Sequence, residues 1–81
     1  MKAFSEKCDN VLLFLNDKKE KISWRDFFNA THIRQNDAIV SFLKNYKGFV
    51  EYDSHDIEIT QLGRDFISTT SFVKQRDSSY L

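Results

Sequence analysis

The sequence KGFVEYDSHDIEITQLGRDFI, from Lys47 to Ile67, decides the fold. Apolar and polar side chains alternate over residues 49–52 and again over 57–59, which is the pattern of strands that are buried on one face. Asp and Ser dominate the four residues between these segments, and both favour turns. The stretch therefore predicts an antiparallel hairpin of two short strands.

A helix is expected on each side of this hairpin. The helix before it should begin between residues 31 and 36 and end at Lys47, because Gly48 is suited to the left-handed conformation that stops a helix. Its apolar side carries Ile39, Phe42, Leu43 and Tyr46. Thr60 is placed to cap the helix after the hairpin. The inner side of that helix is predicted to carry Leu62, Phe66 and Ile67.

Two further helices are predicted nearer the N-terminus. The first is capped by Ser5 and runs to about Asn16, with apolar residues at positions 8, 11, 12 and 15. The second follows Ser23, which pairs with Asp26 in the spacing of a capping box, and it is expected to stop before a turn over 29–31. Ile22 is placed to add a short third strand to the sheet. The predicted core comprises Phe14, Phe27, Phe28, Phe42 and Leu43.

The composition predicts one small domain, residues 1–81, with a dense aromatic core and a tail over 71–81 that is either flexible or part of an interface. A single cysteine, Cys8, cannot form an internal disulfide or a zinc site, and it fits a reducing compartment such as the cytoplasm. No apolar run reaches the roughly 18 residues that a membrane span needs. The N-terminus also lacks the pattern of a signal peptide.

Charge is balanced overall but uneven along the chain. The formal net charge is zero, yet residues 49–60 hold four acidic residues and no Lys or Arg. These acidic residues are Glu51, Asp53, Asp56 and Glu58. Affinity for duplex DNA comes largely from cations that neutralise phosphates, so a neutral domain predicts weak non-specific binding.

Two segments resemble winged helix-turn-helix regulators of the MarR type. In those domains a glycine and an apolar strand follow the helix-turn-helix, and a Leu-Thr-x-x-Gly sequence opens the helix after the wing. Gly48-Phe49-Val50 and Ile59-Thr60-Gln61-Leu62-Gly63 stand at those places. The resemblance implies an α+β fold with a three-helix core, a two- to three-stranded antiparallel hairpin wing and a C-terminal helix. It also implies a small transcriptional regulator that reads double-stranded DNA with its third helix.

The third helix would then carry the nucleic-acid site, which is predicted to comprise Arg34, Asp37, Ser41, Lys44 and Asn45. The alternative is that these residues form only a solvated polar face. A second class of function also fits the sequence, namely a protein-interaction module that does not bind DNA and uses the acidic hairpin. A homodimer interface is predicted near the C-terminus, with a frayed terminus as the alternative. This interface comprises Phe66, Thr70, Phe72 and Val73.

Catalytic and metal-binding chemistry is not indicated. His32 and His55 have no cysteine or carboxylate at the spacing of metal ligands, and no Gly-rich phosphate loop is present. We therefore expect no enzyme activity, no cofactor and no bound metal.

Overall fold

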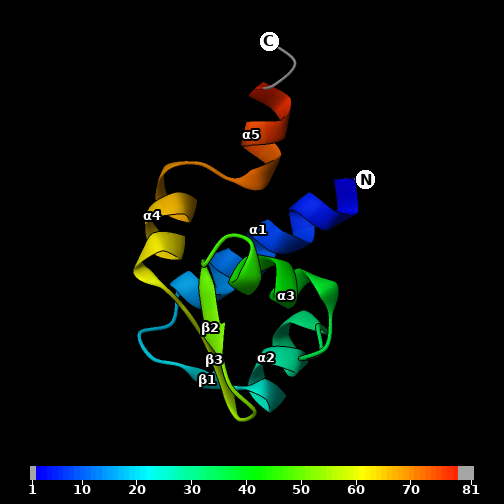
Figure 1. Ribbon diagram of the computed structural model, residues 1–81, viewed down its shortest axis with the longest axis vertical. Helices are drawn as coiled ribbons and strands as arrows, with labels where there is room; N and C mark the ends of the chain where they lie inside the picture. Colours follow the sequence, from blue (N-terminus) through cyan, green and yellow to red (C-terminus); the bar gives the residue numbers. More distant parts are fainter. Residues whose placement is uncertain (1, 79–81) are drawn as a thin grey trace.

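The computed structural model describes residues 2–78. Over this range the chain forms an α+β fold with five helices and a three-stranded antiparallel sheet (Figure 1). In chain order the elements are α1 (Lys2–Asn16), β1 (Ile22–Ser23), α2 (Trp24–Thr31), α3 (Ala38–Asn45), β2 (Val50–Tyr52), β3 (Asp56–Ile59), α4 (Gln61–Thr69) and α5 (Phe72–Ser78).

The sheet has the order β1-β3-β2, and both pairs are antiparallel. Ile57 of the central strand is paired with Ile22 on one side and with Tyr52 on the other. The predicted hairpin and the predicted third strand at Ile22 are therefore confirmed. The hairpin strands begin one residue away from the expected positions, at Val50 and Asp56.

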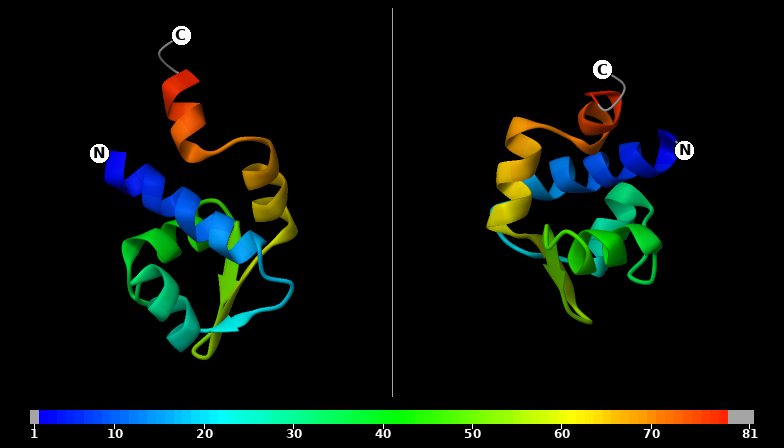
Figure 2. Two further views of the ribbon diagram at one scale, coloured as in Figure 1. Left: turned by 180° about the vertical axis from the view of Figure 1, so that it is seen from behind. Right: turned by 45° about the horizontal axis from the view of Figure 1, so that its top comes forward.

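Helix α1 runs behind the sheet, while α2 and α3 lie to one side of it (Figures 1 and 2). The core lies between them and includes Phe27 and Leu43, which are fully buried as predicted. Phe14 and Phe42 are only partly buried against this cluster. Phe28 was predicted in the core but lies outside it, where its ring contacts His32 and Arg34.

Two residues predicted to face inward are exposed. The side chain of Tyr46 is 84% exposed because α3 ends at Asn45, so Tyr46 follows the last helical turn. Leu62 is 57% exposed in the first turn of α4. Helical spacing does not reveal where a helix ends or which of its turns extend beyond the core.

Several helix boundaries also differ from the predicted ones. Ser5 lies inside α1, which already begins at Lys2. Helix α2 continues to Thr31, whose hydroxyl donates a hydrogen bond to the carbonyl of Phe27 at 2.8 Å. Helix α3 begins only at Ala38, because Asp37 caps it. The caps at Ser23 and Thr60 are confirmed, since their hydroxyls accept hydrogen bonds from the amides of Asp26 and Gly63.

Gly63 brings α4 against the chain that enters β2. A β-carbon at this position would overlap the carbonyl oxygen of Phe49 and would come within 2.8 Å of Cγ1 of Ile59. The same Phe49 carbonyl accepts the amide of Thr60 at 2.9 Å, and the Thr60 hydroxyl donates to the carbonyl of Gly48 at 2.7 Å. Glycine is therefore required for close contact and not for an unusual backbone angle.

Replacing Gly63 with alanine should lower the free energy of unfolding by about 1–3 kcal/mol, because the added methyl group overpacks the junction. Helix propensity alone would favour alanine by about 1 kcal/mol, so the two effects have opposite signs. Urea unfolding of Gly63→Ala and of the exposed control Ser68→Ala measures the difference. Equal or greater stability of Gly63→Ala would show that no close contact exists.

The C-terminal segment forms a separate helix. Helix α4 ends at Thr69, Thr70 is extended, and α5 then lies beside the N-terminal half of α1 (Figure 2). The buried carboxylate of Asp9 on α1 accepts hydrogen bonds from the amides of Phe72 at 2.7 Å and Val73 at 3.1 Å. The first turn of α5 is thus held by a carboxylate on α1.

Phe72, which was predicted to lie in a homodimer interface, packs within the monomer. Its ring lies 4.8 Å from that of Phe66 and 6.0 Å from that of Phe49, and it packs against the buried cluster. Phe66 and Val73 of the same predicted interface lie on different helices, α4 and α5, which the extended residue Thr70 separates. Tyr80 and Leu81 lie outside the described residues.

Replacing Asp9 with alanine should release α5, because two backbone amides lose a charged acceptor. Hydrogen bonds to charged groups contribute about 1.5–3 kcal/mol each, so the amides of residues 72–75 should exchange hydrogen much faster. Hydrogen exchange followed by NMR measures this, with the neighbouring exposed Asn10→Ala as control. Unchanged protection of α5 in Asp9→Ala would contradict the proposed role of the carboxylate.

Candidate nucleic-acid interface

The outer face of α3 is polar and open to solvent. Ala38, Ser41 and Asn45 follow each other at spacings of three and four residues, so their side chains lie on one side of the helix. All three are exposed, whereas Ile39, Val40 and Leu43 on the other side are buried. The helix thus presents a narrow polar surface while its apolar side fixes it to the core.

Hydrogen bonds orient the side chains at both ends of this surface. The amide nitrogen of the Asn45 side chain donates to the Ser41 hydroxyl at 3.2 Å. At the start of the helix, the Asp37 carboxylate accepts the backbone amide of Ile39 at 2.9 Å. Asp37 was predicted in the middle of the helical face, but it is the N-terminal cap, and its charge is directed to the first turn.

Arg34 lies in the connection between α2 and α3 and not on the helix where it was predicted. Its guanidinium carbon lies 4.8 Å from the centre of the Phe28 ring, which is a cation–π contact. The connection starts at His32, which caps α2 in the left-handed conformation with φ of 60°. Arg34 is thus an exposed cation next to the start of α3.

Lys44 is directed toward the hairpin. Its ammonium group lies 3.3 Å from the carbonyl oxygen of Tyr52, 3.7 Å from the Glu51 carboxylate and 4.5 Å from the centre of the Tyr52 ring. Its side chain is 32% exposed. Of the five predicted residues, Ser41 and Asn45 therefore share a face, Arg34 and Asp37 precede it, and Lys44 joins α3 to β2.

The tip of the hairpin is fixed to the start of α2. The carbonyl oxygen of Asp53 accepts the indole N–H of Trp24 at 2.7 Å and the side-chain amide of Gln35 at 3.3 Å. The backbone amide of Trp24 donates to the carbonyl of His55 at 3.1 Å. These contacts of Trp24 and Gln35 were not predicted from the sequence. The position of the only tryptophan, directly after a capping serine, was the available signal.

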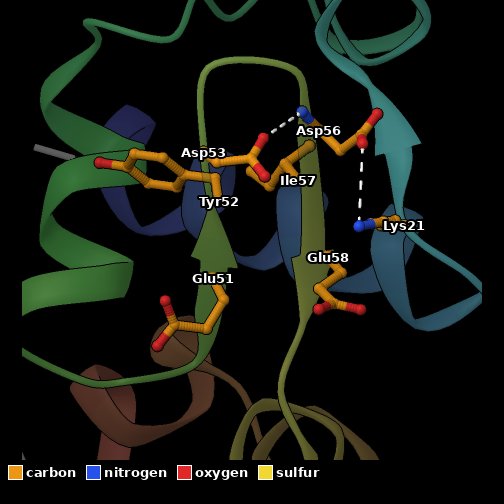
Figure 3. Close-up of a pocket in the computed structure, with 7 residues that line it drawn as sticks. All are labelled: Lys21, Glu51, Tyr52, Asp53, Asp56, Ile57 and Glu58. Atoms are coloured by element: carbon orange, nitrogen blue, oxygen red, sulfur yellow. Dashed lines mark hydrogen bonds and ion pairs between the residues drawn. The ribbon is translucent and has the colours of Figure 1, made fainter.

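The exposed face of the hairpin is acidic (Figure 3). Glu51 is paired directly opposite Glu58, and like charges in that arrangement destabilise a sheet. Asp56 lies on the same strand as Glu58, and its carboxylate is 4.0 Å from the ammonium of Lys21. These side chains surround a shallow hollow of about 150 Å³. Over residues 2–78, no group of His, Cys, Asp and Glu is arranged to hold a metal ion.

The Asp53 carboxylate closes the turn of the hairpin. It accepts the backbone amides of Asp56 at 2.9 Å and His55 at 2.8 Å. These two hydrogen bonds lower the pKa of Asp53 because they stabilise its charged form, and the bond from Asp56 has the larger effect. The folded state therefore gains stability from Asp53 above the usual pKa of an aspartate, and it loses this stability as the pH falls through the lowered pKa.

On acidification, the backbone amide signals of His55 and Asp56 should shift with a midpoint below the usual range of an aspartate. The reason is that the oxygen that accepts both amides loses its negative charge when Asp53 binds a proton, which weakens both hydrogen bonds. An NMR titration from pH 7 to pH 2 measures the midpoint, and Asp53→Asn should abolish this transition. A midpoint within the usual range would mean that the turn does not hold the carboxylate as described.

A second concave surface lies between α1 and the connection that precedes α3. It has a volume of about 430 Å³ and is lined by apolar side chains such as Val11, Phe14 and Ile33 and by the polar side chains of Lys7 and His32. Cys8 on α1 is fully buried. Burial, with smaller contributions from the carboxylates of Asp9 and Asp37, raises the pKa of its thiol to about 12. The thiol is therefore neutral and shielded at pH 7.

None of the helices in residues 2–78 has the length and apolar character needed to cross a membrane. Comparisons with family models, with curated proteins and with solved structures found no match to this chain.

Proposed function

We propose that the chain is a winged-helix DNA-binding protein, a small transcriptional regulator that places α3 in the major groove of duplex DNA. The observation that carries the proposal is the outer face of α3, where Ala38, Ser41 and Asn45 form an exposed surface without a carboxylate. The major groove is about 12 Å wide and admits one helix. The fixed hairpin beside α3 is the candidate wing.

Charge determines what kind of binding this site supports. The net charge is zero, and Lys44, the one cation within α3, is already paired with Glu51, so α3 itself has no free cation to neutralise phosphates. Arg34 is an exposed cation four residues before the start of α3 and is assigned the principal phosphate contact. Non-specific binding should then be weak, and base contacts from α3 should contribute most of the specificity.

Replacing Arg34 with alanine should weaken duplex binding and lower the slope of log affinity against log salt by up to about 1, since one phosphate contact is lost. Fluorescence anisotropy with a random-sequence duplex at about 20 and 150 mM salt measures both quantities. Lys74→Ala removes the same charge from the exposed surface of α5 and should change neither.

The proposal fails if the wild-type protein binds no duplex at low salt. It also fails at this site if Arg34→Ala and Lys74→Ala have equal effects on affinity and slope, since binding would then depend only on overall charge.

The acidic hairpin favours a second candidate function, a protein-interaction module that binds a basic partner and no DNA. Glu51 and Glu58 repel each other across the sheet, and a basic partner would remove this repulsion. A labelled oligolysine peptide tests this reading. Binding that Glu58→Gln weakens, together with no binding of duplex at low salt, would favour the second function over the first.

A homodimer remains part of the first proposal, because paired domains bind two half-sites and gain affinity and specificity together. Phe66 and Phe72 pack against the core of the monomer, but all four residues of the predicted interface, Thr70 and Val73 included, are only partly buried. Each of them therefore keeps some surface that a second copy could cover.

A further inference from the structure

The side chain of Asn45 has a restricted set of free hydrogen-bonding groups. A carboxamide carries two N–H donors and one carbonyl oxygen that accepts. In Asn45, one N–H is donated to the Ser41 hydroxyl at 3.2 Å, one turn earlier on the same exposed face. One donor and one acceptor therefore remain, on a side chain whose orientation Ser41 helps to fix.

This pair of groups matches one base edge in the major groove. Adenine presents the acceptor N7 beside the donor N6, whereas guanine presents two acceptors, N7 and O6. Asn45 can bond both groups of adenine, but against guanine its carbonyl oxygen would face an acceptor. Resting on the function proposed above, we propose that α3 reads A·T base pairs, with Asn45 bonded to an adenine.

Ala38 extends the same preference along the helix. It lies seven residues before Asn45 and within about 20° of it around the helix axis, which corresponds to about 10 Å along the axis. That distance spans about three base-pair steps of DNA. A methyl side chain offers no hydrogen bond but makes a favourable contact with the C5 methyl group of thymine. Ser41, between the two, bonds to several bases and discriminates little.

The cations near α3 do not favour guanine. Arg and Lys are the side chains that bond guanine best, and residues 34–47 contain Arg34, Lys44 and Lys47. The ammonium group of Lys47, beyond the end of α3, lies 6.0 Å from the ring centres of Phe42 and Phe72. Lys44 is engaged with Glu51 and Tyr52 of the hairpin. Arg34 is stacked on Phe28 in the connection before the helix, and the function proposed above assigns it to the phosphate backbone. The exposed helix face itself is left with groups that suit adenine and thymine.

The test begins with selection of bound duplexes from a random-sequence pool by the full-length protein at low salt. The selected site should contain an A·T-rich core. In that site, 7-deazaadenine removes the N7 acceptor, and uracil in place of thymine removes the C5 methyl group. One adenine should be found whose replacement by 7-deazaadenine weakens binding by about 2- to 10-fold, the effect of losing one of the two hydrogen bonds of a bidentate contact. Uracil about three steps away should cause a smaller loss.

Variants link each base to its side chain. In Asn45→Ala, binding should no longer respond to 7-deazaadenine, and in Ala38→Gly it should no longer respond to uracil. Ser41→Ala frees the Asn45 carboxamide and should reduce the discrimination of adenine from guanine. Asn10→Ala, an exposed asparagine on α1, is the matched control and should behave as wild type. Thermal unfolding verifies that each variant is folded.

The possible failures are distinguishable. A selected site rich in G·C, or an A·T-rich site whose affinity is insensitive to 7-deazaadenine, would overturn the assignment of Asn45 and leave DNA binding intact. The absence of binding to any duplex at low salt would overturn the assignment together with the proposed function.

Discussion

The close approach of α4 to the Phe49 carbonyl is the constraint on which the rest of the structure depends. Phe49 follows the stop of α3 and precedes β2, while Gly63 and Thr60 belong to the start of α4. This carbonyl accepts the amide of Thr60 and leaves no room for a side chain at Gly63, so it fixes how the last part of the chain returns to the core beside the hairpin. The stacked rings of Phe49 and Phe66, 4.6 Å apart, add apolar contact beside this junction.

Tertiary contacts explain why the exposed face of α3 is well defined in a domain of this size. A helix of eight residues is too short to be stable alone, so its orientation must come from tertiary contacts. Its buried side supplies most of them, and Lys44 adds a contact between its last turn and β2. The outer side makes no apolar contribution to the core, so its residues are free to serve recognition.

Local rules predicted the parts of the fold that depend on neighbouring residues. The alternation of apolar and polar residues predicted the two hairpin strands. Capping preferences predicted Ser23 and Thr60 as helix caps, because each cap bonds to an amide only three residues away. Contacts between distant residues were not predictable in this way. Helix α5 is held by Asp9, 63 residues before Phe72, and the hairpin tip is held by Trp24, 29 residues before Asp53. Neither partner is indicated by periodicity.

In the candidate site too, features set by neighbouring residues were predicted and features set by distant contacts were not. Ser41 and Asn45 were predicted on one face because helical spacing alone determines it. Arg34 and Asp37 were misplaced because the start of α3 depends on which of several polar residues caps the helix. The direction of Lys44 depends on Glu51 and Tyr52, and their position follows from the hairpin and not from the helix.

The bond between the Trp24 indole and the Asp53 carbonyl has a spectroscopic consequence. Trp24 is the only tryptophan of the chain, and its ring also meets those of Phe27 and Tyr52 edge-on at 5.6 and 5.2 Å. Its emission therefore arises where α2, the core and the hairpin tip meet. The intrinsic fluorescence of the unmodified protein thus reports whether the hairpin tip is in contact with α2, without any introduced dye.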